Sequence, residues 1–277
     1  MTREDEQPAA AAAAAAVGQI SCVPVPHAAA EALMRRVPDD ARLKVLLVSR
    51  PTDADRYTHG HPTAGTTPYV CKTLLDAGFE VELVNNADRI RRPDADQGLD
   101  YFDLVVFHGK LEWADDGAVA ALKRFVETTG RGLVVVHIAS ASFAPNWPPT
   151  PSRDWLDLIG SAFVYGQSDH PTPNMIDVRV AEPDHPIMAG IPPTFRIAED
   201  ELYQNMRPGA DGSGRPLAFG TTLGNDGNPV EEPVAFVLER GNGRVFHLYL
   251  GHFISTHRDW RFQQILTQGM EWAARRR

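Results

Sequence analysis

Short apolar runs recur along the chain, and each of them stops at a polar residue. The run Leu133–Val136 leads directly into His137, and the run Leu104–Phe107 leads into His108. Apolar runs of this length are typical of strands in a parallel sheet that is covered on both faces. On the same grounds three further runs are predicted to be strands: Val45–Val48, Val81–Val84 and Val245–Leu250.

Segments with helical periodicity separate these runs. Ala118 and Leu122 share one face of a predicted helix that begins at Asp115 or Asp116 and stops at Gly130. Strands that alternate with helices predict an α/β fold whose parallel strands are joined by right-handed crossovers. Further helices are predicted from a first turn at Thr66–Pro68 to Gly78, over Trp155–Ile159 and over Trp260–Ala273.

The chain divides into a tail and one domain. Residues 1–37 contain an alanine tract and little periodicity, which predicts a flexible or loosely packed N-terminal tail. Residues 38–277 are predicted to form the α/β domain. Within it, short β-like pieces such as Ile176–Val180 and Val234–Leu238 alternate with Pro- and Gly-rich turns, which indicates an embellished β-rich edge of the same domain.

Composition narrows the classes of partner and compartment. The net charge of −9 gives no basic footprint for nucleic acid or for an anionic membrane surface. Two cysteines, Cys22 and Cys71, are too few for a disulfide framework, and the acidic residues before the alanine tract are unlike the basic start of a secretory signal. No apolar run is long enough to span a bilayer. We therefore expect a cytoplasmic protein with no nucleic-acid or membrane partner.

Histidines at predicted strand ends are the main candidates for chemistry. Ligands bind at the carboxyl ends of parallel strands, and imidazole is an acid, a base or a metal ligand near neutral pH. His137 and His252 both follow predicted strands, so we favour a functional role for them. His108 also follows a strand, but for it, as for His185 and His257, a hydrogen-bonded structural role is the stronger interpretation.

Other candidates lie in predicted loops. His59 and His61 flank a glycine in the first strand-to-helix loop, where a solvated turn is the equal alternative. His170 precedes a proline, which favours an extended backbone. The run Glu199–Tyr203 is an acidic cluster beside an aromatic residue, so Glu199 or Glu201 is a candidate acid or base, with a solvated turn as the alternative.

Missing motifs exclude several chemistries. No glycine-rich dinucleotide or phosphate-binding loop follows a predicted strand, so no nucleotide cofactor is expected. No Gly-x-Ser-x-Gly or Gly-x-Cys-x-Gly surrounds His137, which disfavours covalent acyl chemistry. Histidines with a carboxylate suit a divalent metal, although neither HExxH nor a paired-cysteine spacing is present. The sequence therefore leaves open whether a metal binds, with His59, His137 and His252 as candidate ligands.

Several segments in fixed order resemble the ThuA-like (trehalose utilisation) family, whose relatives have the class I glutamine amidotransferase fold. They are Gly130–His137, Asp184–Ile187 with Gly190–Pro192, Glu199–Tyr203, Gly243–Phe246 with Leu250–His252, and Gln268–Ala273. The resemblance covers residues 43 to 274. One segment departs from the usual pattern, since Tyr165–Pro171 stands where relatives commonly have Gly-His directly.

The resemblance implies a flavodoxin-like, three-layer sandwich with a mostly parallel central sheet. It also implies that His137 replaces the amidotransferase cysteine, so glutamine hydrolysis is not expected. Carbohydrate metabolism is implied, often alongside oxidoreductases that make 3-oxo-glycosides, and a homodimer is a family-level expectation.

Two functional hypotheses follow. The first is an enzyme that acts on a sugar or 3-oxo-glycoside by acid–base chemistry, as an isomerase, epimerase, lyase or hydrolase, with or without a metal. In it His137, His252 and Glu199 or Glu201 are catalytic. The second is a non-catalytic sugar-binding or regulatory module. The predicted substrate contacts are His59, His61, His108, Trp147, His170 and Tyr203, with Trp147 and Tyr203 stacking on the sugar.

Overall fold

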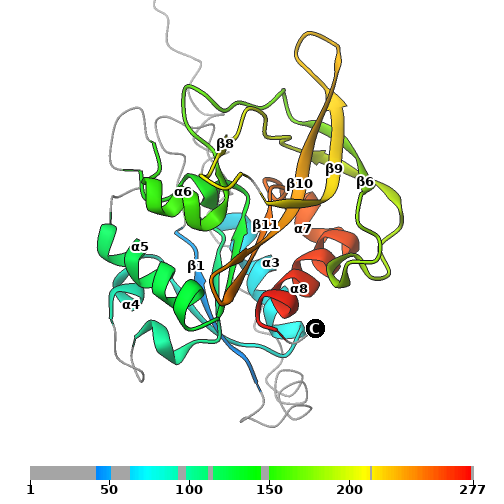
Figure 1. The fold of residues 1–277 in the computed structure, drawn as a ribbon. Coiled ribbons are helices and arrows are strands. Elements are labelled where there is room, and N and C mark those ends of the chain that lie inside the picture. The colour runs from blue at the N-terminus through cyan, green and yellow to red at the C-terminus, as the bar shows by residue number, and fades with distance from the viewer. Residues whose placement is uncertain are drawn as a thin grey trace, which may run out of the picture. The chain divides into compact units, whose positions relative to one another are not determined.

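The structure is a computed structural model (Figure 1). The predicted N-terminal tail, residues 1–37, lies outside the described residues. Six ranges are described: residues 42–50, 63–92, 98–111, 115–144, 150–212 and 214–275.

One nine-stranded sheet organises the domain, in the order β2-β1-β3-β4-β11-β10-β9-β6-β7. Its first five strands are parallel and overlap the five predicted apolar runs, although the last strand ends at Leu248 and not at Leu250. They are β2 (Glu80–Val84), β1 (Lys44–Val48), β3 (Leu104–Phe107), β4 (Gly132–Val136) and β11 (Gly243–Leu248).

The other four strands are antiparallel, so the sheet is mixed. The expectation of a mostly parallel sheet holds only for its first five strands. The reason is local, because only short turns join Leu223 to Pro229 and Arg240 to Gly243, and strands joined by short turns pair antiparallel. The four are β10 (Pro229–Arg240), β9 (Arg215–Leu223), β6 (Asn174–Val180) and β7 (Thr194–Asp200), and a separate pair joins β5 (Ser161–Ala162) to β8 (Arg207–Pro208).

Helices cover both faces of the parallel strands (Figure 1). In β1, Val45 and Leu47 face one core while Leu46 and Val48 face the other, and all four are fully buried. This explains why the strand is apolar at every position. One core includes α3 (Thr63–Asp76) and α8 (Trp260–Ala273), and the other includes α4 (Asp88–Arg91), α5 (Asp116–Lys123) and α6 (Arg153–Ile159).

The helix boundaries largely follow the predicted signals. The Asp115 side chain caps α5 by accepting a hydrogen bond from the Ala118 N–H at 2.9 Å. Gly78 and Gly130 adopt left-handed φ values of 80° and 77°, which suits glycine at helix ends. α3 begins at Thr63, so Pro68 lies inside the helix. The remaining turns are η2 (Leu99–Tyr101), the π-helical η3 (Arg124–Thr128), η4 (His137–Ala141), η5 (Pro186–Met188) and α7 (Ile254–Arg258).

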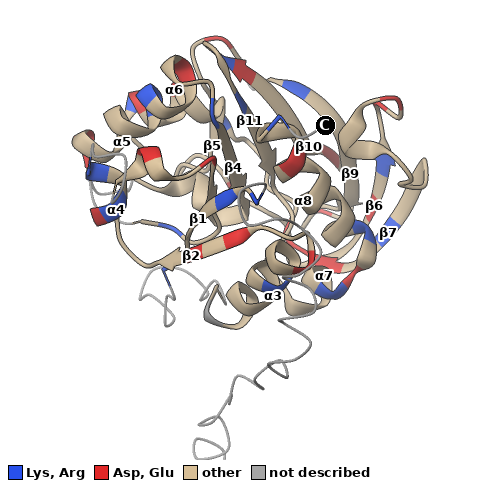
Figure 2. Cartoon of the chain, turned by 90° about the horizontal axis from the view of Figure 1, so that it is seen from below, with Lys and Arg blue, Asp and Glu red and all other residues tan. Residues whose placement is uncertain are grey.

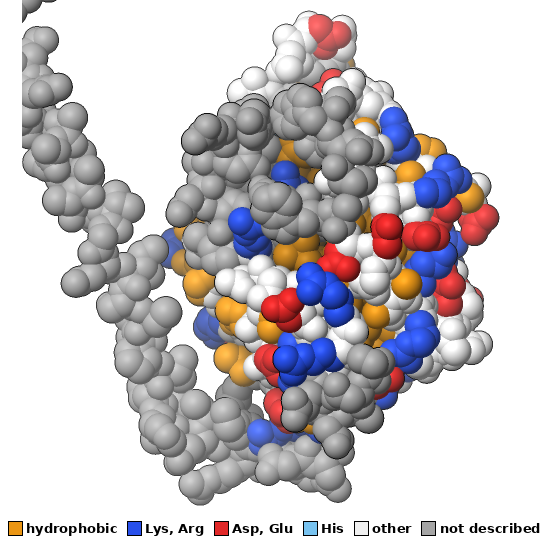
Figure 3. Space-filling view, turned by 90° about the vertical axis from the view of Figure 1, so that its left-hand side faces the viewer, with side chains coloured by type: hydrophobic (Ala, Val, Ile, Leu, Met, Phe, Trp, Pro, Cys, Tyr) orange, Lys and Arg blue, Asp and Glu red, His pale blue; other side chains and the backbone are white. Residues whose placement is uncertain are grey.

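Charge is distributed over the outside of this domain. Strand β4 carries no charged residue, whereas Lys, Arg, Asp and Glu lie on the outer helices and the antiparallel strands (Figure 2). On the face of Figure 3, positive and negative side chains are interspersed. Oppositely charged side chains also pair on the helices, as in the ion pairs Lys123–Asp154 and Arg153–Asp157. Among the described helices, none is both long and apolar enough to cross a membrane.

Candidate active site

His137 occupies a strained turn at the carboxyl end of β4. Its φ is +51°, a left-handed value that is uncommon outside glycine. The turn leads from the strand directly into η4 and leaves the imidazole at the strand end. A strained residue between a strand and a helix is the geometry of a nucleophile elbow. The backbone after β4 thus resembles such an elbow, with an imidazole at the turn.

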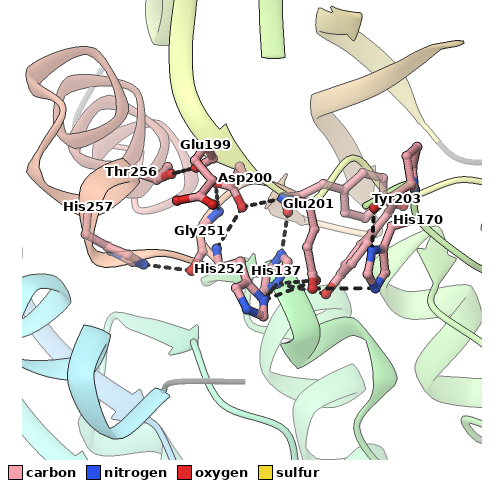
Figure 4. Close-up of polar contacts among 12 residues, drawn as sticks. His137, His170, Glu199, Asp200, Glu201, Tyr203, Gly251, His252, Thr256 and His257 are labelled. Atoms are coloured by element: carbon pink, nitrogen blue, oxygen red, sulfur yellow. Dashed lines mark hydrogen bonds and ion pairs between the residues drawn. The ribbon is translucent and has the colours of Figure 1, made fainter. Parts of the chain in front are cut away.

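Three imidazoles converge on the carboxylate of Glu201 (Figure 4). Glu201 Oε2 is 3.1 Å from His252 Nδ1 and 3.3 Å from His137 Nε2. Glu201 Oε1 is 3.4 Å from His170 Nε2. The two histidines at strand ends also face each other, with His137 Nε2 3.3 Å from His252 Nδ1. Four segments that are far apart in the sequence therefore meet at one carboxylate.

The orientation of His137 is fixed on both sides of its ring. Its Nδ1 lies 2.7 Å from the carbonyl oxygen of Tyr249. A carbonyl only accepts hydrogen bonds, so Nδ1 carries the proton, and in the neutral ring Nε2 accepts from the Tyr203 hydroxyl at 2.9 Å. The Tyr203 ring stacks on the imidazole with centroids 4.5 Å apart. The lone pair of His137 Nε2 is thus directed into the cluster.

Asp200 positions two of the segments that carry the cluster. Its Oδ1 accepts the backbone N–H of Glu201 at 2.8 Å and that of His252 at 3.0 Å, and its Oδ2 accepts the N–H of Gly251 at 2.9 Å. The side chain is 1% exposed, so these bonds are shielded from water. One buried carboxylate therefore ties the end of β7 to the loop after β11 (Figure 4).

The charges within the cluster follow from its contacts. Burial alone raises the pKa of the Glu201 carboxyl, but the contacts with His137 and His252 outweigh burial and lower that pKa below its usual range. Burial, followed by the nearby Glu201 charge, raises the pKa of the Tyr203 phenol well above its ordinary value. At neutral pH Glu201 is a carboxylate and Tyr203 is a hydrogen-bond donor.

A second pair of buried histidines lies outside this cluster. The two nitrogens of His108 lie 3.1 Å from Ser49 Oγ and 3.2 Å from Thr66 Oγ1. His257 donates Nε2–H to the Gly251 carbonyl at 2.9 Å. Burial lowers the pKa of His108 well below its usual value and lowers the pKa of His257 to about 4. These contacts correspond to the hydrogen-bonded role that we favoured for both residues.

The structure gathers only part of the predicted site. His137, His252, His170, Glu201 and Tyr203 meet in the cluster. The side chain of Glu199 is exposed, and only its backbone carbonyl is engaged, by Thr256 Oγ1. His59, His61 and Trp147 lie outside the described residues.

The role expected of Tyr203 needs correction. Its side chain is 1% exposed and its ring is enclosed by His137 and Phe163, at centroid distances of 4.5 Å and 4.9 Å. A buried ring in this position orients His137 and is not placed to stack on the face of a sugar. Its phenol, in contrast, lies within the cluster.

Two polar residues near the strand ends were missed by sequence reasoning. Asp200 belongs to the acidic run, but nothing in the pattern separated it from its neighbours. Lys110 follows β3 by three positions, is 8% exposed, and donates to the Tyr165 hydroxyl at 3.3 Å. The rule that found His137, a polar residue just beyond a buried strand, would also have found Lys110.

Comparisons with known proteins agree with this architecture. A ThuA-like protein from Parabacteroides merdae has 22% identity and a TM-score of 0.62, over 84% of this chain and 90% of that one. One from Bacteroides uniformis has 18% identity and a TM-score of 0.61, over 84% and 91%. A Salmonella typhimurium protein described as cytoplasmic has 10% identity and a TM-score of 0.54, over 83% and 98%. At these identities the likeness shows the mixed α/β fold alone.

Sequence comparison gives the family. No curated protein matches the chain. The model of the ThuA family, described as trehalose utilisation, matches residues 44–273, which contain every residue of the described cluster. The chain therefore belongs to the ThuA family, as the resemblance of its motifs predicted.

Proposed function

We propose that this protein is a carbohydrate-metabolism enzyme that acts on a sugar or 3-oxo-glycoside by acid–base chemistry, within trehalose or disaccharide utilisation. The observation that carries the proposal is the convergence of His137, His252 and His170 on the buried Glu201 carboxylate. Clusters of titratable groups whose pKa values are strongly perturbed are typical of catalytic sites. The family description, trehalose utilisation, indicates the class of substrate.

His252 is the base in this proposal. Its Nδ1 faces Glu201 Oε2 at 3.1 Å, so the carboxylate stabilises the imidazolium that forms when Nε2 takes a proton. The side chain of His252 is 8% exposed and can be reached by a substrate, whereas the side chain of Glu201 is 1% exposed. In this proposal Glu201 acts through His252, and the buried Glu201 is taken as the carboxylate in place of the exposed Glu199.

The chemistry is removal of a proton from the carbon beside a ketone. The C–H proton moves to His252, and the electron pair enters an enediolate whose oxygen needs a hydrogen-bond donor. His170 would donate in its doubly protonated form, because its Nδ1–H is engaged by the Pro171 carbonyl at 2.9 Å and its Nε2 lies 3.4 Å from Glu201 Oε1. Return of the proton to another position gives an isomer or epimer, and expulsion of a glycosidic oxygen gives elimination.

The proposal extends to fold and location. Helices on both faces of the parallel strands support a flavodoxin-like, three-layer arrangement related to class I glutamine amidotransferases. An imidazole at the elbow after β4, where those enzymes have a cysteine, supports a reaction other than glutamine hydrolysis. Two cysteines in 277 residues support a cytoplasmic location.

The test is proton exchange. The purified protein is incubated in deuterated water with trehalose, related disaccharides and their 3-oxo derivatives, and followed by NMR. Deuterium beside the carbonyl, a new isomer or a cleaved glycoside is the expected result. His252→Gln should abolish it, while the matched control His185→Gln, at the cap of η5, should not. Saturable shifts without exchange or product on the whole panel would replace this proposal by the sugar-binding module.

A further inference from the structure

We propose that His137 Nε2, His252 Nδ1 and Glu201 Oε2 form a binding site for one first-row divalent transition-metal ion. Ion binding stands on geometry alone. Its part in turnover, as the group that polarises a substrate carbonyl, rests on the function proposed above, with His170 as the base in place of His252, whose Nδ1 would then be a ligand. The ion would occupy the place of the protons shared within the cluster.

The three atoms form a nearly equilateral triangle. Their separations are 3.1 Å, 3.3 Å and 3.3 Å. Ligand atoms about 2.1 Å from a zinc-like ion are separated by about 3.4 Å in tetrahedral geometry and about 3.0 Å in octahedral geometry. An ion about 2.1 Å from each corner of this triangle lies about 1 Å out of its plane. In the described residues, these are the three side chains whose donor atoms are grouped closely enough to hold an ion.

His137 presents the lone pair that ligation needs. His137 uses its Nδ1–H on the Tyr249 carbonyl, which leaves Nε2 as the coordinating atom. Such a hydrogen bond, made by the ring nitrogen opposite the metal, is the usual support of a metal-bound histidine. Ligation by Nε2 would free the Tyr203 hydroxyl, now 2.9 Å from that atom, to donate to a substrate oxygen.

The carboxylate oxygen in the triangle lacks a hydrogen bond. Glu201 Oε2 is fully buried and, within the described part of the chain, no donor reaches it with hydrogen-bond geometry. A buried carboxylate oxygen in this state is costly unless a cation compensates it.

The surrounding residues hold the ligands as a metal site requires. Asp200 fixes the backbone of both Glu201 and His252, so two ligands move together. His170 lies against the other oxygen of Glu201 at 3.4 Å and is the imidazole left for proton transfer once His137 and His252 are ligands. Three protein ligands leave at least one position for substrate, as catalytic sites do. Two imidazoles and a carboxylate favour zinc, iron, manganese, cobalt or nickel over calcium or magnesium.

The first experiment uses the unaltered chain without a histidine tag. The protein is stripped with chelator and titrated with Co²⁺, and the visible absorption is recorded before and after addition of Zn²⁺. We expect saturation at one equivalent and displacement by Zn²⁺. In protein with ¹⁵N-labelled histidine, Zn²⁺ should shift one ring through Nε2 and one through Nδ1, the pair that His137 and His252 predict. Substoichiometric binding, or shifts of other histidines, overturns the proposal.

The second experiment uses matched carboxylates. Glu201→Gln should weaken Co²⁺ binding by more than the about 10–100-fold typical of losing an outer partner of a metal site. Glu199→Gln removes an exposed carboxylate two residues away and should leave binding unchanged. Equal binding by the two variants overturns the site. Failure of metal binding together with intact proton exchange would refute the ion but keep the proposed enzyme, whereas binding without exchange would do the reverse.

Discussion

The domain buries histidines in two different ways. His137 and His252 surround an ionised carboxylate, whereas His108 and His257 are hydrogen bonded to hydroxyl groups and a carbonyl. His108 and His257 are as buried as the first pair, but burial acts on them with no carboxylate in contact and lowers their pKa values. Burial of a histidine is therefore not itself a sign of function. The informative feature is a charge placed to hold a proton or a cation.

The largest expected effect comes from removing that charge. Glu201→Gln keeps the size of the side chain but cannot stabilise the imidazolium of His252, so turnover should fall about 10²–10⁴-fold, the usual contribution of acid–base catalysis. The measurement is the initial rate of deuterium incorporation or product formation. Glu199→Gln, whose side chain is exposed, is the control and should retain the wild-type rate. Equal rates in the two variants would show that the carboxylate is not part of the chemistry.

The stability of the protein at acid pH tests the comparison for a buried histidine that has no carboxylate partner. His247 in β11 is fully buried beside Phe236 and Tyr249, and burial lowers its pKa to about 3. The unfolded chain binds this proton near pH 6.5 and the folded chain does not. Stability is therefore fully present above pH 6.5 and falls as the pH drops toward 3, by about 1.4 kcal/mol per pH unit.

His247→Gln should remove this contribution. Urea unfolding at several pH values between 7 and 4.5 measures it, with a flatter profile expected for the variant than for the wild type. His185→Gln should flatten the profile less, because burial lowers the pKa of His185 by a smaller amount than that of His247. Parallel profiles for His247→Gln and wild type would mean that other groups cause the acid sensitivity.

A smaller effect is expected for the residue that positions the cluster. Asp200→Asn keeps one acceptor oxygen but turns an amide toward a backbone N–H, so some of its three hydrogen bonds are lost. We expect a loss of about 1–3 kcal/mol in the free energy of unfolding. Metal affinity should fall by about 10–100-fold. Thermal unfolding and Co²⁺ titration measure the two, and a variant with unchanged metal affinity would remove Asp200 from the supporting role.

The sequence predicted one half of the sheet far better than the other. The parallel strands are buried on both faces, so each appears as an uninterrupted apolar run, and His137 and His252 were found from where two of the runs end. β7 alternates buried and exposed positions and includes Arg196 and Glu199, so it does not stand out as a strand. The residues of the site that come from the parallel half were therefore predictable.

The sequence named Glu199 and Glu201 as candidates but could not separate the two, because of how β7 ends. In a continuing strand Glu199 and Glu201 would share a face. The strand ends at Asp200 instead, and the chain turns so that Asp200 and Glu201 are both buried while Glu199 stays exposed. This turn depends on the hydrogen bonds of Asp200 to the loop after β11, which is 51 residues away for Gly251. A contact of that range leaves no periodic signal in the sequence.

The smallest effect on turnover is expected at His108, which stood among the predicted substrate contacts. His108→Gln removes hydrogen bonds to Ser49 and Thr66, so it should cost about 1 kcal/mol of stability for each bond lost. Turnover should stay close to wild type, because the ring contacts hydroxyl groups and His257 and not the carboxylate. His252→Gln should lose far more rate than His108→Gln, because His252 contacts the carboxylate. The two variants are measured side by side. A large rate loss in His108→Gln would show that both kinds of buried histidine belong to one extended site.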